Sequence, residues 1–271
     1  MKIGIIGLGL IGASYAKRLS KTYDIYGYDI DASVMKRMQK DSLKGNALEH
    51  LASLDIVVLA LNPPIAKTFM EKHGDELKDT VLLTDVCGVK KPVVSFIESR
   101  LGEKQSYLSH HPMSGNPEGG FENSSPTLFE NANLVYVTTE KTKESDLGRL
   151  NSVLEKLGFS SFSVMDATTH DTHIAHTSQL THLISSVLVL SNDAPLPKEV
   201  MGNSYRDLTR IADIEPDMWS ELFMENKQAL IHTLDDFQTA IETFKTHLEN
   251  NDKASIKTLL EKTRNRYRQN K

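Results

Sequence analysis

The sequence contains one cysteine and lacks any apolar run long enough to cross a membrane. Cys87 alone excludes an internal disulfide, and such low cysteine usage is typical of a reducing compartment. Every apolar stretch is shorter than the roughly 18 residues that a transmembrane helix needs. The apolar start, MKIGIIGLGLIGASYA, differs from a signal peptide in its spaced glycines and in the charged KRLSK that follows. We therefore expect a cytoplasmic protein with no membrane partner.

An excess of positive charge is also missing. The chain has 31 Lys and Arg residues against 36 Asp and Glu residues, which gives a formal net charge of −5. A nucleic-acid-binding protein usually carries a basic surface, so we expect no nucleic-acid partner. The length of 271 residues favours two domains.

The first part of the chain alternates between two hydrophobic patterns. Short apolar runs typical of buried strands alternate with segments of helical periodicity. The expected strands cover residues 2–7, 23–29, 54–61, 80–86, 132–140 and 160–166, and the expected helices cover 10–21, 33–41, 89–101 and 145–158. This alternation predicts an α/β fold over residues 1–165, with a mostly parallel, Rossmann-type sheet covered by helices on both faces.

Beyond about residue 165 only helical periodicity remains, so we predict an all-helical second domain over residues 166–271. The longest helical pattern covers residues 218–250. Within it, apolar residues recur at steps of four and three, as in a coiled-coil seam: Leu230, Leu234, Phe237, Ile241, Phe244 and Leu248. The pattern alone does not decide whether this seam packs inside its own subunit or against a second copy.

The segment GLGLIG directly follows the first expected strand and opens the first expected helix. In that context Gly7 allows the tight turn, Gly9 lets a pyrophosphate approach the backbone, and Gly12 lets helix and strand pack closely. Leu10 and Ile11 begin the helix, whose amides and dipole favour an anion. The segment therefore predicts a dinucleotide-binding site.

Asp29 ends the second expected strand, 22 residues after Gly7. A carboxylate at this place accepts hydrogen bonds from a ribose 2′-hydroxyl and repels the 2′-phosphate of NADP. We therefore predict NAD as the cofactor.

Three further segments are placed to face the nicotinamide: TDVCGVKK (84–91), SHHPMSG (109–115) and YRDLTRIAD (205–213). The second puts His110 and His111 at the start of an expected loop rich in glycine and proline, and the third adds two arginines. A histidine accepts the proton of an alcohol as hydride leaves, and an arginine holds a carboxylate with two hydrogen bonds. These residue types indicate the oxidation of a hydroxylated carboxylic acid.

The motifs GLGLIGAS, TDVCGVKK, HHPMSGNPEGG, HDTHIAHTSQLTH and YRDLTRIADIEPDMW resemble, in order and spacing, those of the prephenate dehydrogenase family. The resemblance extends from residue 1 to about residue 250. It implies a Rossmann domain joined to a helical dimerisation domain, and hence a homodimer. It also implies NAD-dependent oxidative decarboxylation of prephenate to 4-hydroxyphenylpyruvate and CO2 in tyrosine biosynthesis, whereas some relatives use arogenate.

The resemblance also assigns roles to individual residues. The family's catalytic histidine precedes the proline of its H-P-M-x-G motif, which corresponds to His111, so His110 is expected to be structural. The arginine of the T-R-I-A segment is Arg210, which is expected to bind a substrate carboxylate.

Two family motifs are altered in this chain. The helical S-H-x-P-H motif falls on residues 178–182, where Ser178 and His182 are retained but Gln179 and Thr181 replace a histidine and a proline. Ser178, Gln179 and His182 are expected to line the substrate site. Gly88 stands where the family usually has a serine that bonds the catalytic histidine or the substrate hydroxyl.

Other interpretations are weaker. A metal site among the histidines of residues 170–182 is disfavoured because His170 and His176 diverge on a helix and no cysteine joins them, so we predict no metal. Cys87 is expected to be a packing residue. A β-hydroxyacid dehydrogenase would need a catalytic lysine in the helical domain, where this chain has His182 and Arg210. A non-catalytic NAD(H) sensor would lack both a base and a carboxylate clamp.

Overall fold

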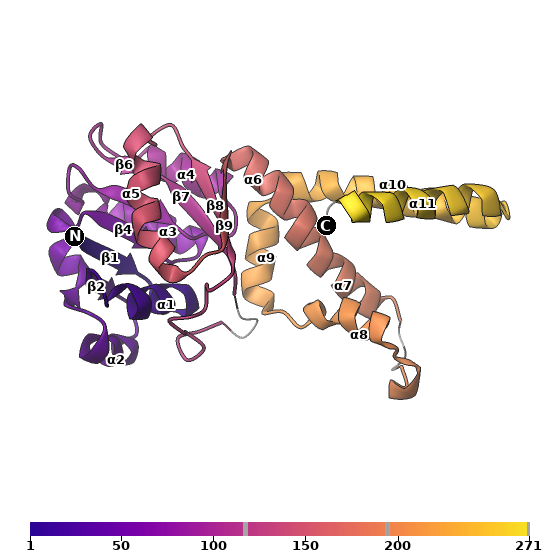
Figure 1. The fold of residues 1–271 in the computed structure, drawn as a ribbon, viewed down its shortest axis with the longest axis horizontal. Coiled ribbons are helices and arrows are strands. Elements are labelled where there is room, and N and C mark those ends of the chain that lie inside the picture. The colour runs from indigo at the N-terminus through magenta and orange to yellow at the C-terminus, as the bar shows by residue number, and fades with distance from the viewer. Residues whose placement is uncertain (116–118, 193, 195, 270–271) are drawn as a thin grey trace.

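A computed structural model describes residues 1–115, 119–192, 194 and 196–269. Figure 1 shows two parts, with strands and covering helices on the left and helices alone on the right. Residues 116–118, which belong to the HHPMSGNPEGG motif, lie outside the described residues.

The larger sheet has six parallel strands in the order β3-β2-β1-β4-β5-β6. Its central strands are buried on both faces, which explains why they are almost continuously apolar. The strand order reverses between β1 and β4, and a crevice at that point of a parallel sheet is the usual place for a nucleotide. The strands are β1 (Lys2–Ile6), β2 (Asp24–Tyr28), β3 (Gly45–Asn46), β4 (Ile56–Leu59), β5 (Leu82–Asp85) and β6 (Ser106–Tyr107).

Helices cover both faces of this sheet, as an α/β fold requires. Ile3 and Ile5 of β1 pack into a cluster with α1, α2 and α5, whereas Ile6 points to the opposite face, against α3 and α4. The helices are α1 (Leu10–Leu19), α2 (Ala32–Asp41), η1 (Ala47–Ser53), α3 (Pro63–His73), η2 (Gly74–Glu76), α4 (Lys91–Glu98), α5 (Glu144–Leu154) and η3 (Glu155–Leu157). Helix α3 was not among the predicted elements, although the proline pair after β4 occupies its first turn.

A second sheet has the order β7-β8-β9, with β7 (Ser109–Met113) antiparallel to β8 (Asn133–Thr138) and β9 (Ser161–Asp166) parallel to β8. The histidines were expected to stand at the start of a loop within residues 108–120, but this expectation was wrong for residues 109–113, which form strand β7. Pro112 is tolerated because β7 is an edge strand, which pairs on one side. Side chains alternate along a strand, so His110 and His111 point to opposite faces.

After Asp166 every regular element that the structure describes is a helix. This confirms the predicted fold class. The elements are α6 (Ala167–Ile174), the π-helical turn η4 (Ala175–Gln179), α7 (Leu180–Leu190), η5 (Lys198–Val200), α8 (Asn203–Thr209), η6 (Arg210–Ala212), α9 (Pro216–Glu225), α10 (Lys227–Glu249) and α11 (Lys253–Gln269). Asp166 starts α6 by accepting hydrogen bonds from the amides of Thr168 and Thr169.

Helices α10 and α11 lie side by side and project away from the rest of the chain (Figure 1). The apolar seam of α10 is therefore covered unevenly: Leu230 is 5% exposed, whereas Ile241 and Leu248 are 49% and 64% exposed. None of the helices in the described part of the chain is long and apolar enough to span a membrane.

Candidate active site

Each glycine of GLGLIG is explained by a different feature of the structure. Gly7 has a positive φ of +89°, and a Cβ atom there would lie 2.4 Å from the carbonyl oxygen of Ala60. A Cβ atom on Gly12 would lie 1.9 Å from the carbonyl oxygen of Gly7. Around Gly9, in contrast, no heavy atom of the described residues, apart from those of Gly9 and its two neighbours in the chain, lies within 4 Å of the added Cβ position. The first and third glycines thus serve the protein's own packing, and the second leaves open space for a ligand.

This open space lies over the start of α1. Gly9 is the residue before the helix and provides no side-chain cap, so the amides of Leu10 and Ile11 lack intrahelical partners. Asp29 directly follows β2, and its Oδ2 accepts the Leu8 amide at 2.7 Å while its Oδ1 accepts the Asp31 amide at 2.9 Å. Amide donors, open space and a fixed carboxylate fit the pyrophosphate and ribose of NAD.

His110 is fully buried and both of its ring nitrogens are occupied. Nε2 lies 3.0 Å from the Tyr15 hydroxyl, and Nδ1 lies 2.6 Å from the Thr84 hydroxyl. Burial, assisted by the nearby Lys90 ammonium, lowers the pKa of His110 to about 3. His110 is therefore a neutral core residue in this structure.

His111 points to the other face of β7 and is only half-buried. Its Nδ1 lies 2.9 Å from Nε2 of His170 on α6. Its Nε2 faces the turn after β5, because a Cβ atom placed on Gly88 would lie 4.0 Å from this nitrogen. Burial and then the neighbouring His170 lower the pKa of His111 well below its usual value. A neutral imidazole with one nitrogen held and the other facing a turn is suited to act as a base.

His170 and Asp171 continue the contacts of His111. Nδ1 of His170 lies 2.8 Å from Oδ1 of Asp171, and the Asp171 carboxylate accepts the amides of Lys90 and Lys91 at 2.8 Å each. Neither residue was predicted to belong to the site. The sequence places His170 59 residues from His111, and only the docking of α6 against β7 brings them together.

A buried ion pair holds the backbone beneath these histidines. The Lys90 ammonium donates to Asp85 Oδ1 at 2.8 Å and to the carbonyl oxygen of His110 at 2.7 Å. Tyr107 donates to the other Asp85 oxygen at 2.6 Å. Burial raises the pKa of Asp85, but Lys90 overcomes this effect and the pKa falls to about 2. Cys87 lies in the same turn, where burial raises the pKa of its thiol, so a packing role fits it.

The helical part holds the other residues that the sequence predicted for the substrate site. His182 on α7 packs against Trp219 of α9 with the two rings tilted by 33° and their centroids 3.9 Å apart. Its Nδ1 donates to the Ser178 carbonyl oxygen at 2.9 Å, which leaves Nε2 as the nitrogen for a ligand. Arg210 is exposed at the start of η6, which packs against α7. Trp219 was not predicted as a site residue, although it closes the YRDLTRIADIEPDMW motif.

Gln179 lies in the π-helical turn, a feature that often marks functional sites. Its side chain is buried, donates to the Leu222 carbonyl oxygen at 2.8 Å and accepts from Asn226 at 2.7 Å. Leu222 in turn approaches Gly88, since a Cβ atom on that glycine would lie 3.6 Å from its Cδ2. In this structure Gln179 therefore holds α9 against the turn that faces His111.

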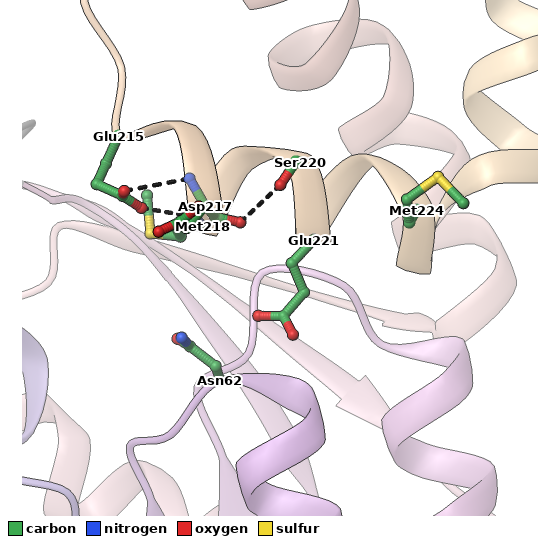
Figure 2. A pocket seen from close by; sticks show the side chains of 7 residues that line it. All are labelled: Asn62, Glu215, Asp217, Met218, Ser220, Glu221 and Met224. Carbon is green, nitrogen blue, oxygen red and sulfur yellow. Dashed lines mark hydrogen bonds between the residues drawn. The ribbon is translucent and has the colours of Figure 1, made fainter.

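A hollow of about 540 Å³ separates the loop after β4 from α9 (Figure 2). Asn62 faces Glu221 across it, and the remaining lining comes from α9 and the residue before it: Glu215, Asp217, Met218, Ser220 and Met224. Glu215 is engaged in capping α9 through the amides of Asp217 and Met218. Within the described ranges, no group of three or more histidine, cysteine or acidic side chains is arranged to hold a metal ion.

Comparison with known proteins gives two matching family models and several relatives. The model described as prephenate dehydrogenase, nucleotide-binding domain, matches residues 13–162, and the model described as prephenate dehydrogenase, dimerization domain, matches residues 166–262. The prephenate dehydrogenase of Lactococcus lactis subsp. cremoris is 30% identical over 273 residues, which cover 96% of this chain and 75% of that protein.

Two solved structures are similar over nearly their whole length. The arogenate dehydrogenase of Synechocystis superposes with a TM-score of 0.87 at 26% identity, covering 98% of this chain and 100% of that one. The prephenate dehydrogenase of A. aeolicus, in complex with hydroxyphenyl propionate and NAD+, gives a TM-score of 0.84 at 25% identity, covering 98% and 97%.

Proposed function

The chain belongs to the prephenate dehydrogenase family of NAD-binding oxidoreductases, and from this premise we propose that it converts prephenate to 4-hydroxyphenylpyruvate and CO2. The observation that carries the proposal is the state of His111, whose imidazole is neutral and anchored through Nδ1 while Nε2 faces the Gly88 turn. Such a group is able to accept a proton from a substrate hydroxyl.

In the proposed reaction His111 Nε2 takes the proton of the C4 hydroxyl of prephenate. NAD, when bound, supplies the acceptor for the C4 hydride. As the bond between C1 and its carboxylate breaks, the electron pair moves through the ring to the new carbonyl oxygen, and CO2 leaves. His111 returns its proton to that oxygen, which becomes the phenol. Aromatisation drives this step, so the protein mainly has to orient the substrate and supply one base.

Substrate orientation is assigned to the helical part. We propose that Arg210 binds a substrate carboxylate through two hydrogen bonds, and that His182 adds a contact through Nε2. Ser178 contributes by fixing the His182 ring through its carbonyl oxygen, and Gln179 contributes by holding Leu222 of α9 in place.

Gly88 leaves space next to His111 Nε2, where the substrate hydroxyl is proposed to bind. A Cβ atom at this position would lie at ordinary contact distance from both Leu222 and His111, so the backbone does not exclude a small side chain there. With glycine this room is left to the substrate. We propose that the substrate hydroxyl contacts His111 Nε2 directly.

Arogenate is the second candidate substrate. The likeness to the Synechocystis arogenate dehydrogenase supports it, as does the acidic lining of the hollow in Figure 2, where Asp217 and Glu221 are suited to face an ammonium group. A homodimer is also proposed, because residues 166–262 match a dimerization domain and the outer part of the α10 seam is exposed in one chain.

A direct assay separates these functions. The protein is incubated with NAD and with prephenate, arogenate or 3-hydroxyisobutyrate, while NADH is followed at 340 nm and the product is identified by chromatography. We expect kcat/KM for prephenate to exceed that for arogenate by about tenfold or more. The reverse order identifies an arogenate dehydrogenase, activity on 3-hydroxyisobutyrate alone identifies a β-hydroxyacid dehydrogenase, and no NADH with any substrate contradicts the proposal.

A further inference from the structure

We propose that Asp171, His170 and His111 form a proton relay, in which His170 is a positioning residue that selects the basic tautomer of His111. This inference rests on the proposed function for the identity of the base. It stands on three side chains joined in series, with separations of 2.8 Å between Asp171 and His170 and 2.9 Å between His170 and His111.

Asp171 determines which atom donates and which accepts in each hydrogen bond of this series. Backbone amides only donate, so the Asp171 carboxylate accepts at Oδ1 from Lys90 and at Oδ2 from Lys91. Both amides lie at the start of α4, where the helix dipole favours a negative charge. Because both Asp171 oxygens act as acceptors, Nδ1 of His170 is the donor of the next hydrogen bond.

The remaining steps follow from the chemistry of neutral imidazole, which has one N–H donor and one acceptor nitrogen. Burial lowers the pKa of His170 more than its hydrogen bond to Asp171 raises it, so the ring is neutral. With its proton on Nδ1, His170 presents the lone pair of Nε2 to His111. His111 must then donate through Nδ1, and its Nε2 toward Gly88 is left unprotonated. If His170 instead donated to His111 Nδ1, the proton of His111 would lie on Nε2, and this nitrogen could not accept a proton from the substrate.

The same series of hydrogen bonds stabilises the positive charge that His111 gains during the reaction. When His111 Nε2 takes the substrate hydroxyl proton, the proton on Nδ1 shifts toward His170 Nε2, and the positive charge approaches the Asp171 carboxylate. Asp171 takes no proton in this proposal, and every shift reverses when the ring oxygen of the product regains its proton. His170 and Asp171 are 1% and 4% exposed, and such a dry environment strengthens each of these interactions.

If His170 has a purely structural role, different results are expected for its variants. Asp171 caps α4 from α6 and so ties the two parts of the chain together, and His170 would then serve only to fill space beside it. Two substitutions at His170 separate the roles. In His170→Gln the amide reaches the place of Nε2 and still accepts from His111, whereas in His170→Asn it reaches the place of Nδ1 and keeps only the contact with Asp171.

The first measurement is steady-state kinetics of the full chain with NAD and prephenate. We expect His170→Asn to lower kcat by about 10²–10³-fold and His170→Gln by about tenfold, with KM for prephenate and the affinity for NAD unchanged in both. His173→Asn, an exposed change on the same helix, is the matched control and should leave kcat unchanged. Equal kcat values for the two His170 variants, or a faster Asn variant, would overturn the relay.

The second measurement does not depend on the substrate. Nitrogen-15 NMR of labelled histidine in the wild-type protein, with His111 assigned by its Asn variant, reports which ring nitrogen carries the proton. The relay requires protonated Nδ1 on both His111 and His170, and the same His111 state in His170→Gln. A His111 ring protonated on Nε2 contradicts the relay. If this spectrum agrees but no substrate is oxidised, the proposed function fails and the relay geometry stands.

Discussion

The Leu8 amide donates a 2.7 Å hydrogen bond to the Oδ2 atom of Asp29, so the carboxylate that ends β2 is fixed to the glycine turn that follows β1. The two segments are also joined by the Gly7 amide, which donates to the Tyr28 carbonyl oxygen at 2.8 Å. A negative charge is thus held at one place beside the open space over Gly9, which gives the cofactor preference a structural basis.

Cofactor preference should depend on this charge. We expect the wild-type protein to favour NAD strongly over NADP, because Asp29 repels a 2′-phosphate. Asp29→Asn keeps an oxygen for the Leu8 amide but removes the charge, and should lower the ratio of kcat/KM values for NAD and NADP by about tenfold or more. Comparable wild-type kcat/KM values for the two cofactors would show that Asp29 does not set the preference.

Substrate affinity should depend on Arg210. Arg210→Ala is expected to lower kcat/KM by about 10–100-fold, chiefly through KM for prephenate, because a carboxylate clamp acts before and during the reaction. Arg206 is a matched control, since it is an exposed arginine one helical turn away on α8. Arg206→Ala should leave KM unchanged, and an unchanged KM in Arg210→Ala would remove Arg210 from the substrate site.

The exposed seam of α10 predicts association. Ile241 and Leu248 are exposed although they continue the seam that begins at buried Leu230, so a second copy is expected to cover them. Light scattering should give about twice the chain mass of 30.3 kDa. Ile241→Lys should shift the protein toward monomer, while Thr239→Lys on another face of α10 should not. A wild-type monomer at micromolar concentration would contradict the proposed homodimer.

Acid stability should report the burial of His110. Its pKa is about 3 in the folded chain against 6.5 for an unperturbed histidine, so the unfolded state takes up the proton first as pH falls. The stabilisation from neutral His110 is complete above pH 6.5 and is lost progressively toward about pH 3. His110→Asn should cost about 1–3 kcal/mol of unfolding free energy at pH 7, because the Tyr15 contact is lost.

Thermal melts at several pH values test this. The difference in Tm between wild type and His110→Asn should shrink as pH falls below 6.5, because asparagine does not titrate. His232→Asn changes an exposed histidine and should show no such trend. A pH-independent difference for His110→Asn would mean that His110 does not titrate in this way.

The sheet was predictable from sequence because its signals are local. Each central strand is an apolar run, and the spacing of Gly7, Gly9 and Gly12 marks the turn whose geometry the structure shows. Strand β7 was not predictable in the same way. Its His-His-Pro composition is typical of a loop, and it becomes a strand because β8 supplies the pairing and the core accepts His110.

The site was predictable only where one residue type carries the chemistry. A histidine able to act as a base and an arginine able to bind a carboxylate can be picked out as His111 and Arg210, the two residues for which we propose these roles. The partners that tune them are not, because these contacts join segments far apart in the sequence. His170 reaches His111 across 59 residues, and Trp219 reaches His182 through the packing of α9 on α7.

The central claim is that His111, and not its neighbour, removes the substrate proton. The most direct test is kcat at saturating NAD and prephenate for His111→Asn and His110→Asn, followed as NADH at 340 nm and scaled to the fraction of protein that binds NAD. We predict that His111→Asn lowers kcat by about 10²–10⁴-fold and that His110→Asn lowers it much less. A larger loss of kcat in His110→Asn than in His111→Asn would contradict the assignment.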